Sequence, residues 1–213
     1  MMTDSIRTLE TLEIVSGALC LDFVNTVNSR LMPEHDYLVH YSDLVGWANK
    51  VGILSPMQTN QLQKRAKQNV EEAENALQTT RRIREFIYQI FLNTAKGSEP
   101  NHEDIEFFVQ LYAEAISHGQ FLKKEDHYTT AWKLDEAFDA VLWPIIHSAG
   151  ELLLSRELGQ VKECPGCGWL FLDTSKNQSR RWCSMDTCGA RDKMRRYHKR
   201  QQGKRKPPAV SPL

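Results

Sequence analysis

The sequence lacks any long apolar run. Within its 213 residues, no segment approaches the roughly 20 apolar residues that are needed to cross a bilayer. The first five residues also lack the basic and then apolar profile of a secretory signal. The content of 41% hydrophobic and 25% charged residues is ordinary for a soluble globular protein. We therefore expect a cytoplasmic protein without a membrane partner.

Familiar catalytic motifs are absent as well. The sequence contains no HExxH, P-loop, GxGxxG or GxSxG pattern. Its seven histidines show no spacing typical of metal ligands. We therefore do not expect an enzyme and assign no catalytic residue.

Cysteine is scarce except in one stretch of 25 residues. That stretch holds four of the five cysteines, Cys164, Cys167, Cys183 and Cys188, as two close pairs. Such pairs can bring four thiolates to one ion, and the absence of an open ligand position favours a single structural Zn²⁺ over a catalytic one. A four-cysteine iron site fits the same spacing. The remaining Cys20 is expected to be a buried, small apolar residue, with a redox-sensing thiol as the alternative.

Positive charge is concentrated in the same region. Residues 161–206 contain 13 Lys and Arg against four acids, a net charge of +9, while the rest of the chain has a net charge of −9. Four thiolates around one Zn²⁺ would lower the C-terminal value to about +7. A basic region that is offset by an acidic one favours a polyanionic partner.

The residues around the cysteines predict a knuckle, a β-hairpin and a helix in that order. Pro165 and Gly166 suit a tight turn between the first two ligands. A strand is expected over 169–173, a return strand over 180–182 that leads to Cys183, and a helix over about 187–201. This order is similar to that of a treble-clef zinc finger.

The predicted helix has two different faces. Ala190, Met194 and Tyr197 line one face, which we expect to pack on the hairpin. The other side is basic, and Lys and Arg there can reach phosphates, while Arg can also read guanine edges. Together with two arginines before the third cysteine, these residues form the predicted nucleic-acid-binding set: Arg180, Arg181, Arg191, Lys193, Arg195, Arg196, Lys199 and Arg200.

Three aromatic residues of the finger have two interpretations. Trp169, Phe171 and Trp182 can stack on bases, or they can form the core of a small zinc domain. We expect the core role. The basic surface itself can serve a nucleic acid, an acidic protein partner or solvation alone, and the first is favoured.

Residues 1–155 predict a mainly α domain with minor β structure. Apolar periodicity and capping residues predict helices over about 17–29, 42–51, 56–95 (one long helix or two in line), 101–117 and 134–154. A hairpin is expected over 120–132. Pro144 is expected to bend or divide the last helix. Residues 203–213 are predicted to be a disordered tail.

The segment from Cys164 to Arg200 resembles the CGNR zinc-finger family of bacteria. The upstream LCLDFVNTV, residues 19–27, and WPIIHSAGELL, residues 143–153, resemble the helical domain that usually precedes it, known as ABATE or Putative stress-induced transcription regulator. The resemblance implies a zinc-dependent DNA-binding finger and an N-terminal regulatory domain acting in a stress response. The sequence departs from the family at Ala190, where asparagine is usual.

A cluster of polar residues in the first predicted helix is a candidate effector site. Asp22, Asn25 and Thr26 lie in LDFVNT, and Ser29 continues the same face. They form either the solvent face of an amphipathic helix or a buried cluster lining a ligand pocket, with Arg82 as the counter-charge.

The sequence therefore predicts a bacterial transcription regulator with two domains. Residues 1–155 sense a small-molecule effector or dimerise, and residues 160–202 form a zinc finger that binds DNA. Because a single small finger binds weakly, we expect a homodimer. The alternatives are a finger that binds proteins, or a small-molecule-binding or enzymatic helical domain with an accessory finger.

Overall fold

The computed structural model describes residues 8–32, 35–134 and 137–204, with side chains described up to Gln201. The predicted tail, 203–213, lies outside these residues apart from its first two, which end the last helix. None of the helices in the described ranges combines the length and the apolar character of a membrane span.

The N-terminal region is helical, as predicted. Its helices are α1 (Leu19–Val24), α2 (Tyr41–Lys50), α3 (Pro56–Gln68), α4 (Val70–Ala95), α5 (His102–Ser117) and α6 (Leu142–Leu154). The predicted hairpin is present as the antiparallel strands β1 (Gly119–Lys123) and β2 (Tyr128–Trp132). The C-terminal region contains the 3₁₀ helix η1 (Arg156–Gln160), the antiparallel strands β3 (Val161–Glu163) and β4 (Leu170–Leu172), the π-helical turn η2 (Met185–Gly189) and α7 (Ala190–Lys204).

Capping residues set several of these boundaries. The Ser55 hydroxyl accepts a hydrogen bond from the Gln58 backbone N–H, and the Gln58 side chain accepts one from the Ser55 N–H, forming a capping box at the start of α3. Asn101 caps α5 by accepting from the Asp104 N–H at 3.2 Å. The long run predicted over 56–95 is two helices, because the backbone leaves helical geometry at Asn69.

Two predicted helices are too long. The helix expected over 17–29 ends at Val24, and the one expected to start at Leu134 starts at Leu142. The second helix was predicted to start too early because Leu134 and Phe138 fit the apolar pattern of α6. Both residues are buried, but they precede the helix. Pro144 does not bend α6, because it lies in the first turn, where a backbone N–H has no partner within the helix.

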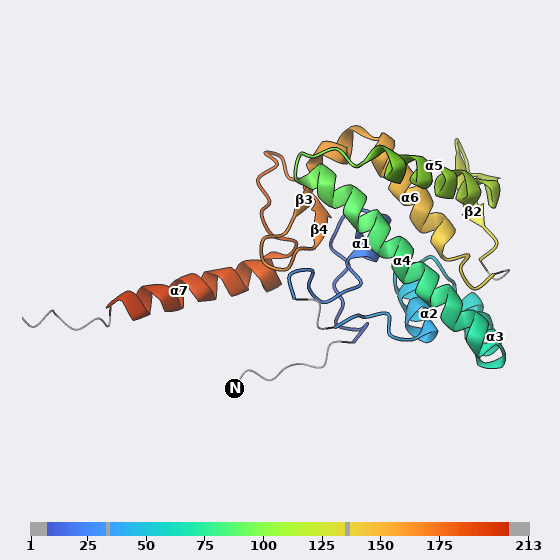
Figure 1. Cartoon of the computed structure of the whole chain (residues 1–213), viewed down its shortest axis with the longest axis horizontal. Coiled ribbons are helices and arrows are strands. Elements are labelled where there is room, and N and C mark those ends of the chain that lie inside the picture. Colours follow the sequence, from blue (N-terminus) through green and yellow to red (C-terminus); the bar gives the residue numbers. More distant parts are fainter. Residues whose placement is uncertain (1–7, 33–34, 135–136, 205–213) are drawn as a thin grey trace, which may run out of the picture.

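The core is built around α1. This short helix packs against both α4 and α6, and α4 crosses the molecule beside it (Figure 1). The rings of Phe23 and Trp47 lie 5.5 Å apart in the centre, and both side chains are fully buried. Burial of a side chain such as Phe23 contributes about 1.5–3 kcal/mol to folding. The same apolar cluster continues into β4 through Leu170 and Phe171, so the finger is part of the main core.

In contrast, α7 points away from the body of the molecule. It starts at the cysteine cluster and extends outward as the red helix in Figure 1. The finger is therefore anchored at one end, and its helix is exposed.

Candidate zinc site and basic helix

The first cysteine pair lies in the turn between β3 and β4. The Cys164 N–H donates to the Trp169 carbonyl, and the Gly168 N–H donates to the Cys164 carbonyl, both at 2.8 Å. Gly168 has a φ of +74°, and a Cβ there would lie 2.7 Å from Cβ of Arg30. Both the backbone conformation and the close approach require glycine at this position.

One strand of the finger's hairpin precedes the knuckle in the sequence and the other follows it, whereas we expected both strands after the knuckle. We expected a return strand at 180–182, but β4 pairs with β3, with Glu163 opposite Leu170. The sequence prediction was wrong because β3 precedes the first cysteine and was not recognised. The order of elements is therefore strand, knuckle, strand, loop, π-turn and helix.

The second cysteine pair is held by the turn η2. The Ser184 hydroxyl accepts from the Thr187 N–H at 3.4 Å, and the Ser184 carbonyl accepts from the Gly189 N–H at 3.0 Å. These bonds close the chain on itself between Cys183 and Cys188. The two sulfur atoms consequently lie 3.7 Å apart.

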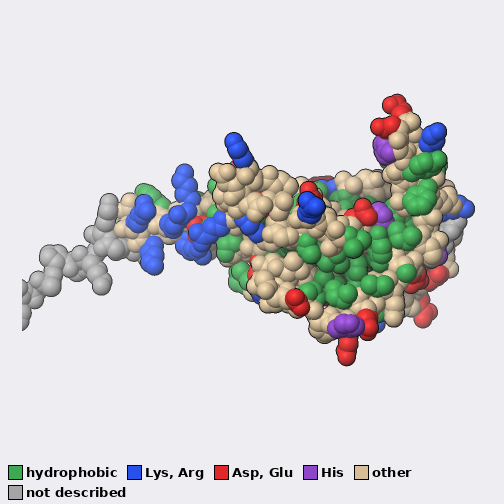
Figure 2. Space-filling model, turned by 90° about the horizontal axis from the view of Figure 1, so that it is seen from above, with side chains coloured by type: hydrophobic (Ala, Val, Ile, Leu, Met, Phe, Trp, Pro, Cys, Tyr) green, Lys and Arg blue, Asp and Glu red, His purple; other side chains and the backbone are tan. Residues whose placement is uncertain are grey.

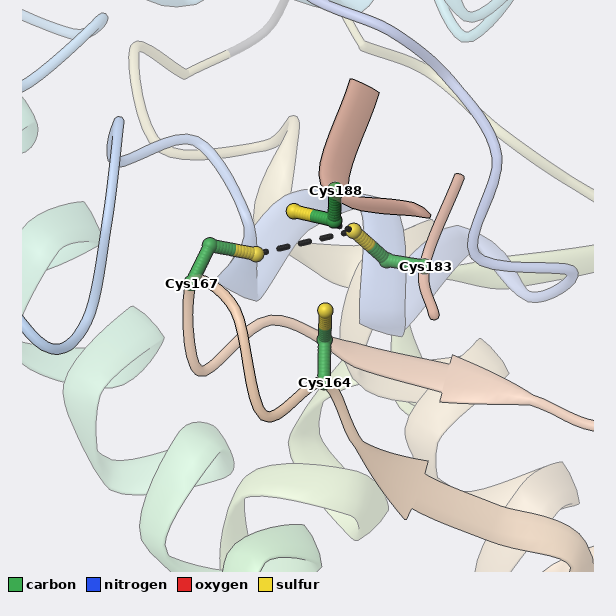
Figure 3. A group of neighbouring side chains, drawn as sticks. All are labelled: Cys164, Cys167, Cys183 and Cys188. Carbon is green, nitrogen blue, oxygen red and sulfur yellow. Dashed lines mark hydrogen bonds between the residues drawn. The ribbon is translucent and has the colours of Figure 1, made fainter. Parts of the chain in front are cut away.

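The four sulfur atoms converge on one point (Figure 3). All lie within 4.8 Å of one another, and those of Cys167 and Cys183 are 3.5 Å apart. A tetrahedron with Zn–S bonds of about 2.3 Å has edges of about 3.8 Å, whereas a disulfide bond measures only about 2.05 Å. The predicted ligands therefore form a buried site for one zinc ion.

Cys20 is separate from this site. It is fully buried in α1, and burial raises the pKa of its thiol to about 12. A thiol that stays protonated is a poor nucleophile. The expected role as a small apolar core residue fits this environment.

Sequence reasoning missed the polar centre of the loop that leads to the third cysteine. Asp173 is fully buried and accepts hydrogen bonds from Lys162 Nζ at 2.6 Å and from the Arg180 N–H at 2.9 Å. Burial opposes its ionisation, but the Lys162 ammonium and the Ser175 hydroxyl hold the pKa of Asp173 below its usual range. The one sequence signal for this buried acid is the position of Asp173 directly after the apolar strand β4.

Arg180 has a different environment from the one we predicted. Its guanidinium donates to the carbonyls of Trp182 at 3.0 Å, Val15 at 3.1 Å and Cys183. It also lies over the ring of Phe171, 4.6 Å from the centroid. Its Nε and Nη2 atoms donate to carbonyls within the protein, so Arg180 braces a zinc ligand against the N-terminal region. We therefore leave it out of the proposed nucleic-acid interface.

This brace predicts a difference between two neighbouring arginines. Arg180→Ala is expected to lower the free energy of unfolding by about 2 kcal/mol, because hydrogen bonds from a charged group are lost. Arg181 is exposed and contacts only one face of the Trp182 ring among the interactions described, so Arg181→Ala should cost less than about 1 kcal/mol. Urea denaturation of the zinc-loaded proteins measures both values. Equal losses would contradict the bracing role.

The cations of α7 are solvent-exposed. Residues 190–201 contain six Lys and Arg against one acid, a net charge of +5, and Figure 2 shows the basic side chains gathered along this helix. The acid, Asp192, is buried and pairs with Arg195 at 2.6 Å and Arg196 at 2.8 Å. The side chains of these two arginines are nevertheless 77% and 63% exposed. The helix is therefore a cationic projection.

The apolar face of α7 does not pack on the hairpin, contrary to our expectation. Ala190 is exposed, and Met194 and Tyr197 are 54% and 59% exposed. The reason is that the hairpin already packs against α4 and α1, with Leu170 and Phe171 both buried in the common core. Residue 190, where the family usually has asparagine, therefore faces solvent.

The aromatic residues of the finger are core residues, as expected. Trp169, Phe171 and Trp182 are 7%, 0% and 6% exposed. Stacking on bases would require these rings to leave the core.

The polar cluster near α1 is buried, so its interpretation as a solvent face is wrong. Asp22, Asn25 and Thr26 are 8%, 1% and 0% exposed. The Asn25 amide bonds to both the N–H and the carbonyl of Leu170, so part of this cluster contacts the finger.

The predicted counter-charge of this cluster is also corrected. Arg82 is exposed, whereas Arg84 is buried and donates to the Thr26 hydroxyl at 3.1 Å. Arg84 makes a bidentate ion pair with Asp36, at 2.8 and 2.6 Å. The sequence RRIRE contains three arginines, and periodicity alone did not identify the buried one.

A cleft of about 200 Å³ opens beside the zinc ligands, between the finger and the N-terminal segment. It is lined by Thr11, Glu13, Asn28, Tyr37, Cys167, Trp169, Cys183, Thr187, Cys188 and Arg191. Three of the four zinc ligands therefore border this cleft.

The structure combines a helical domain with a four-cysteine zinc site whose base is buried against that domain. An exposed basic helix follows the zinc site, and together these features define a zinc-finger protein. Residues 17–156 match the family model ABATE, Putative stress-induced transcription regulator, and residues 160–201 match the CGNR zinc finger. The chain belongs to the ABATE family and has a CGNR finger, which confirms the resemblance seen in the sequence. No curated protein matches the chain.

Proposed function

We propose that this protein is a cytoplasmic transcription regulator of bacteria that binds duplex DNA through α7. The observation that carries this proposal is the exposed cationic helix fixed at its base by the zinc site. Its 15 residues span about 22 Å at 1.5 Å per residue. The major groove of B-DNA is about 12 Å wide and admits an α-helix, so α7 can lie lengthwise in it.

The proposed interface uses the exposed arginine before the third cysteine together with the exposed cations of α7 up to Arg200. They are Arg181, Arg191, Lys193, Arg195, Arg196, Lys199 and Arg200. Contacts with phosphates supply the affinity, and any arginine that reaches a guanine edge supplies specificity. The pairs of Arg195 and Arg196 with Asp192 do not prevent this, because exposed ion pairs are worth only about 0–1 kcal/mol.

The helical domain would provide the regulatory input, by dimerisation or by binding an effector. An apolar groove of about 350 Å³ between α5 and α6 supports this role. Figure 2 shows the apolar surface around it, and the lining includes Ile105, Phe108, Val109, Leu153 and Leu154. A dimer would place two fingers on one DNA site, which compensates for the weak binding of a single small finger.

A second candidate partner is an acidic protein. Met194 and Tyr197 are exposed on the same helix as the cations, and an amphipathic helix of this kind can bind in a groove of another protein. In that case the positive charge of α7 would select an acidic groove.

Binding of mixed-sequence duplex DNA across a salt series tests the main proposal. We expect affinity to fall steeply with salt, because each neutralised phosphate contributes about −0.9 to the slope of log K against log salt. Removal of zinc with a chelator should abolish binding, since the finger then loses its fold. Sedimentation of the complex gives the number of chains per duplex. Zinc-loaded protein that fails to bind at low salt would reject the DNA proposal in favour of a protein partner.

A further inference from the structure

The N-terminal segment contacts the backbone of a zinc ligand directly. The carbonyl of Cys167 accepts hydrogen bonds from the Arg30 N–H at 2.7 Å and from the Ser29 hydroxyl at 3.3 Å. Ser29 is 8% exposed and also accepts bonds from the N–H groups of Leu31 and Met32, both at 3.2 Å. The orientation of this ligand therefore depends on a segment about 140 residues earlier in the chain.

Asn25 continues this contact along the outer edge of β4. Its amide nitrogen donates to the Leu170 carbonyl at 2.8 Å, and its amide oxygen accepts from the Leu170 N–H at 3.1 Å. The Leu172 N–H donates to the Ser16 carbonyl at 2.7 Å. The outer edge of β4 is thus paired by the N-terminal segment, while β3 pairs its inner edge. Asn25 is 1% exposed, so water does not replace these bonds in the folded state.

The knuckle is held from the side of α4 as well. The Tyr88 hydroxyl donates to the Gly168 carbonyl at 3.1 Å, and the indole N–H of Trp169 donates to the Val27 carbonyl at 2.7 Å. The guanidinium of Arg30 lies over the Tyr88 ring, 4.0 Å from the centroid, and pairs with Glu85. The residues that follow Cys167 are therefore fixed by α4 and by the segment from Asn25 to Arg30.

We propose that the helical domain supplies the outer shell of the zinc site, with Asn25 and Ser29 as positioning residues. Groups that orient metal ligands typically change metal affinity 10–100-fold when they are removed. The coupling is reciprocal, so bound zinc in turn holds the segment from Asn25 to Arg30 in place. A change in this segment is then transmitted to α7, and the state of the metal is transmitted to the helical domain. The inference does not depend on the nature of the partner of α7.

Zinc affinity of an Asn25→Ala variant tests the positioning role. We expect the dissociation constant, measured by competition with a chromophoric chelator, to rise about 10–100-fold. Asn49→Ala is the control. The Asn49 amide also donates to a backbone carbonyl, that of Leu54 at 2.9 Å, and Leu54 lies in the segment that follows α2. The control should lose stability but keep its zinc affinity within about twofold. Unchanged affinity in Asn25→Ala, with stability lowered as in the control, would overturn the proposal.

Two further measurements cover the case in which Asn25→Ala does not fold. Ser29→Ala removes one bond to Cys167 and should weaken zinc binding in the same direction. In the unmodified protein, chelation should increase amide hydrogen exchange over residues 25–32 and in α4 near Tyr88. Loss of protection confined to residues 161–201 would show that the finger unfolds alone and would reject the coupling. Neither measurement uses DNA, so failure here is distinct from failure of the proposed function.

Discussion

Replacement of Cys183 by serine is expected to abolish zinc binding and to unfold the finger. Structural zinc contributes about 10–16 kcal/mol in small zinc fingers, as much as the whole stability of a typical domain, about 5–15 kcal/mol. We expect zinc, measured by elemental analysis, to fall from one ion per chain to nearly none. The near-ultraviolet circular dichroism of Trp169 and Trp182 should fall with it.

The same substitution at the remaining cysteine provides the control. Cys20 is buried in α1, away from the four sulfur atoms, so Cys20→Ser introduces a comparable polar change without removing a ligand. This variant should lose some stability but retain one zinc ion. If Cys183→Ser keeps a full equivalent of zinc, or if Cys20→Ser loses it, the assignment of the ligands is wrong.

The metal ligands were predictable because their chemistry is local in sequence. The spacing of two close cysteine pairs is enough to identify a zinc site, and the convergence of Cys164, Cys167, Cys183 and Cys188 confirms it. Capping signals at Ser55 and Asn101 were predictable for the same reason, since cap and partner lie three residues apart.

The contacts of the zinc site with the helical domain were not predictable in this way. Asn25 and Leu170 are separated by 145 residues, and nothing in the local pattern around either one indicates the other. Periodicity placed the polar residues of LDFVNT on one face, and an exposed polar face is more common than a buried one. Of the polar residues on this buried face, Asn25 bonds to the backbone of Leu170 in β4. Asp22 instead accepts from the Ser16 N–H, and Thr26 bonds to the Phe23 carbonyl and to Arg84.

Apolar patterning also failed to show what covers each face. Leu134 and Phe138 extended the pattern of α6, although both residues precede that helix and are buried in the core. Met194 and Tyr197 gave α7 an apolar face that no described element covers. Apolar periodicity shows which face of a helix is apolar, but the tertiary arrangement decides which element covers that face.

Removal of four cations from α7 is expected to eliminate most of the affinity for DNA. The substitutions Arg191→Ala, Lys193→Ala, Lys199→Ala and Arg200→Ala leave the Asp192 pairs intact. Each lost phosphate contact lowers the salt slope by about 1, so we expect the slope to fall by up to about 4 and the affinity at about 0.1 M salt to fall at least 100-fold. Alanine favours the helical conformation and these side chains are exposed, so α7 and the zinc content should persist.

A variant with the same change in charge on the helical domain separates a local interface from net charge. Lys64 and Lys67 on α3, Lys123 on β1 and Lys124 after it are exposed, and their replacement by alanine also removes four positive charges. This variant should bind DNA within about threefold of the unmodified protein at moderate salt, because its lysines lie outside the proposed interface and distant charges are screened beyond about 10 Å. Equal losses in the two variants would attribute DNA binding to overall charge. A loss confined to the α7 variant, with zinc retained, would assign the interface to α7, because the zinc site that orients the helix would be unchanged.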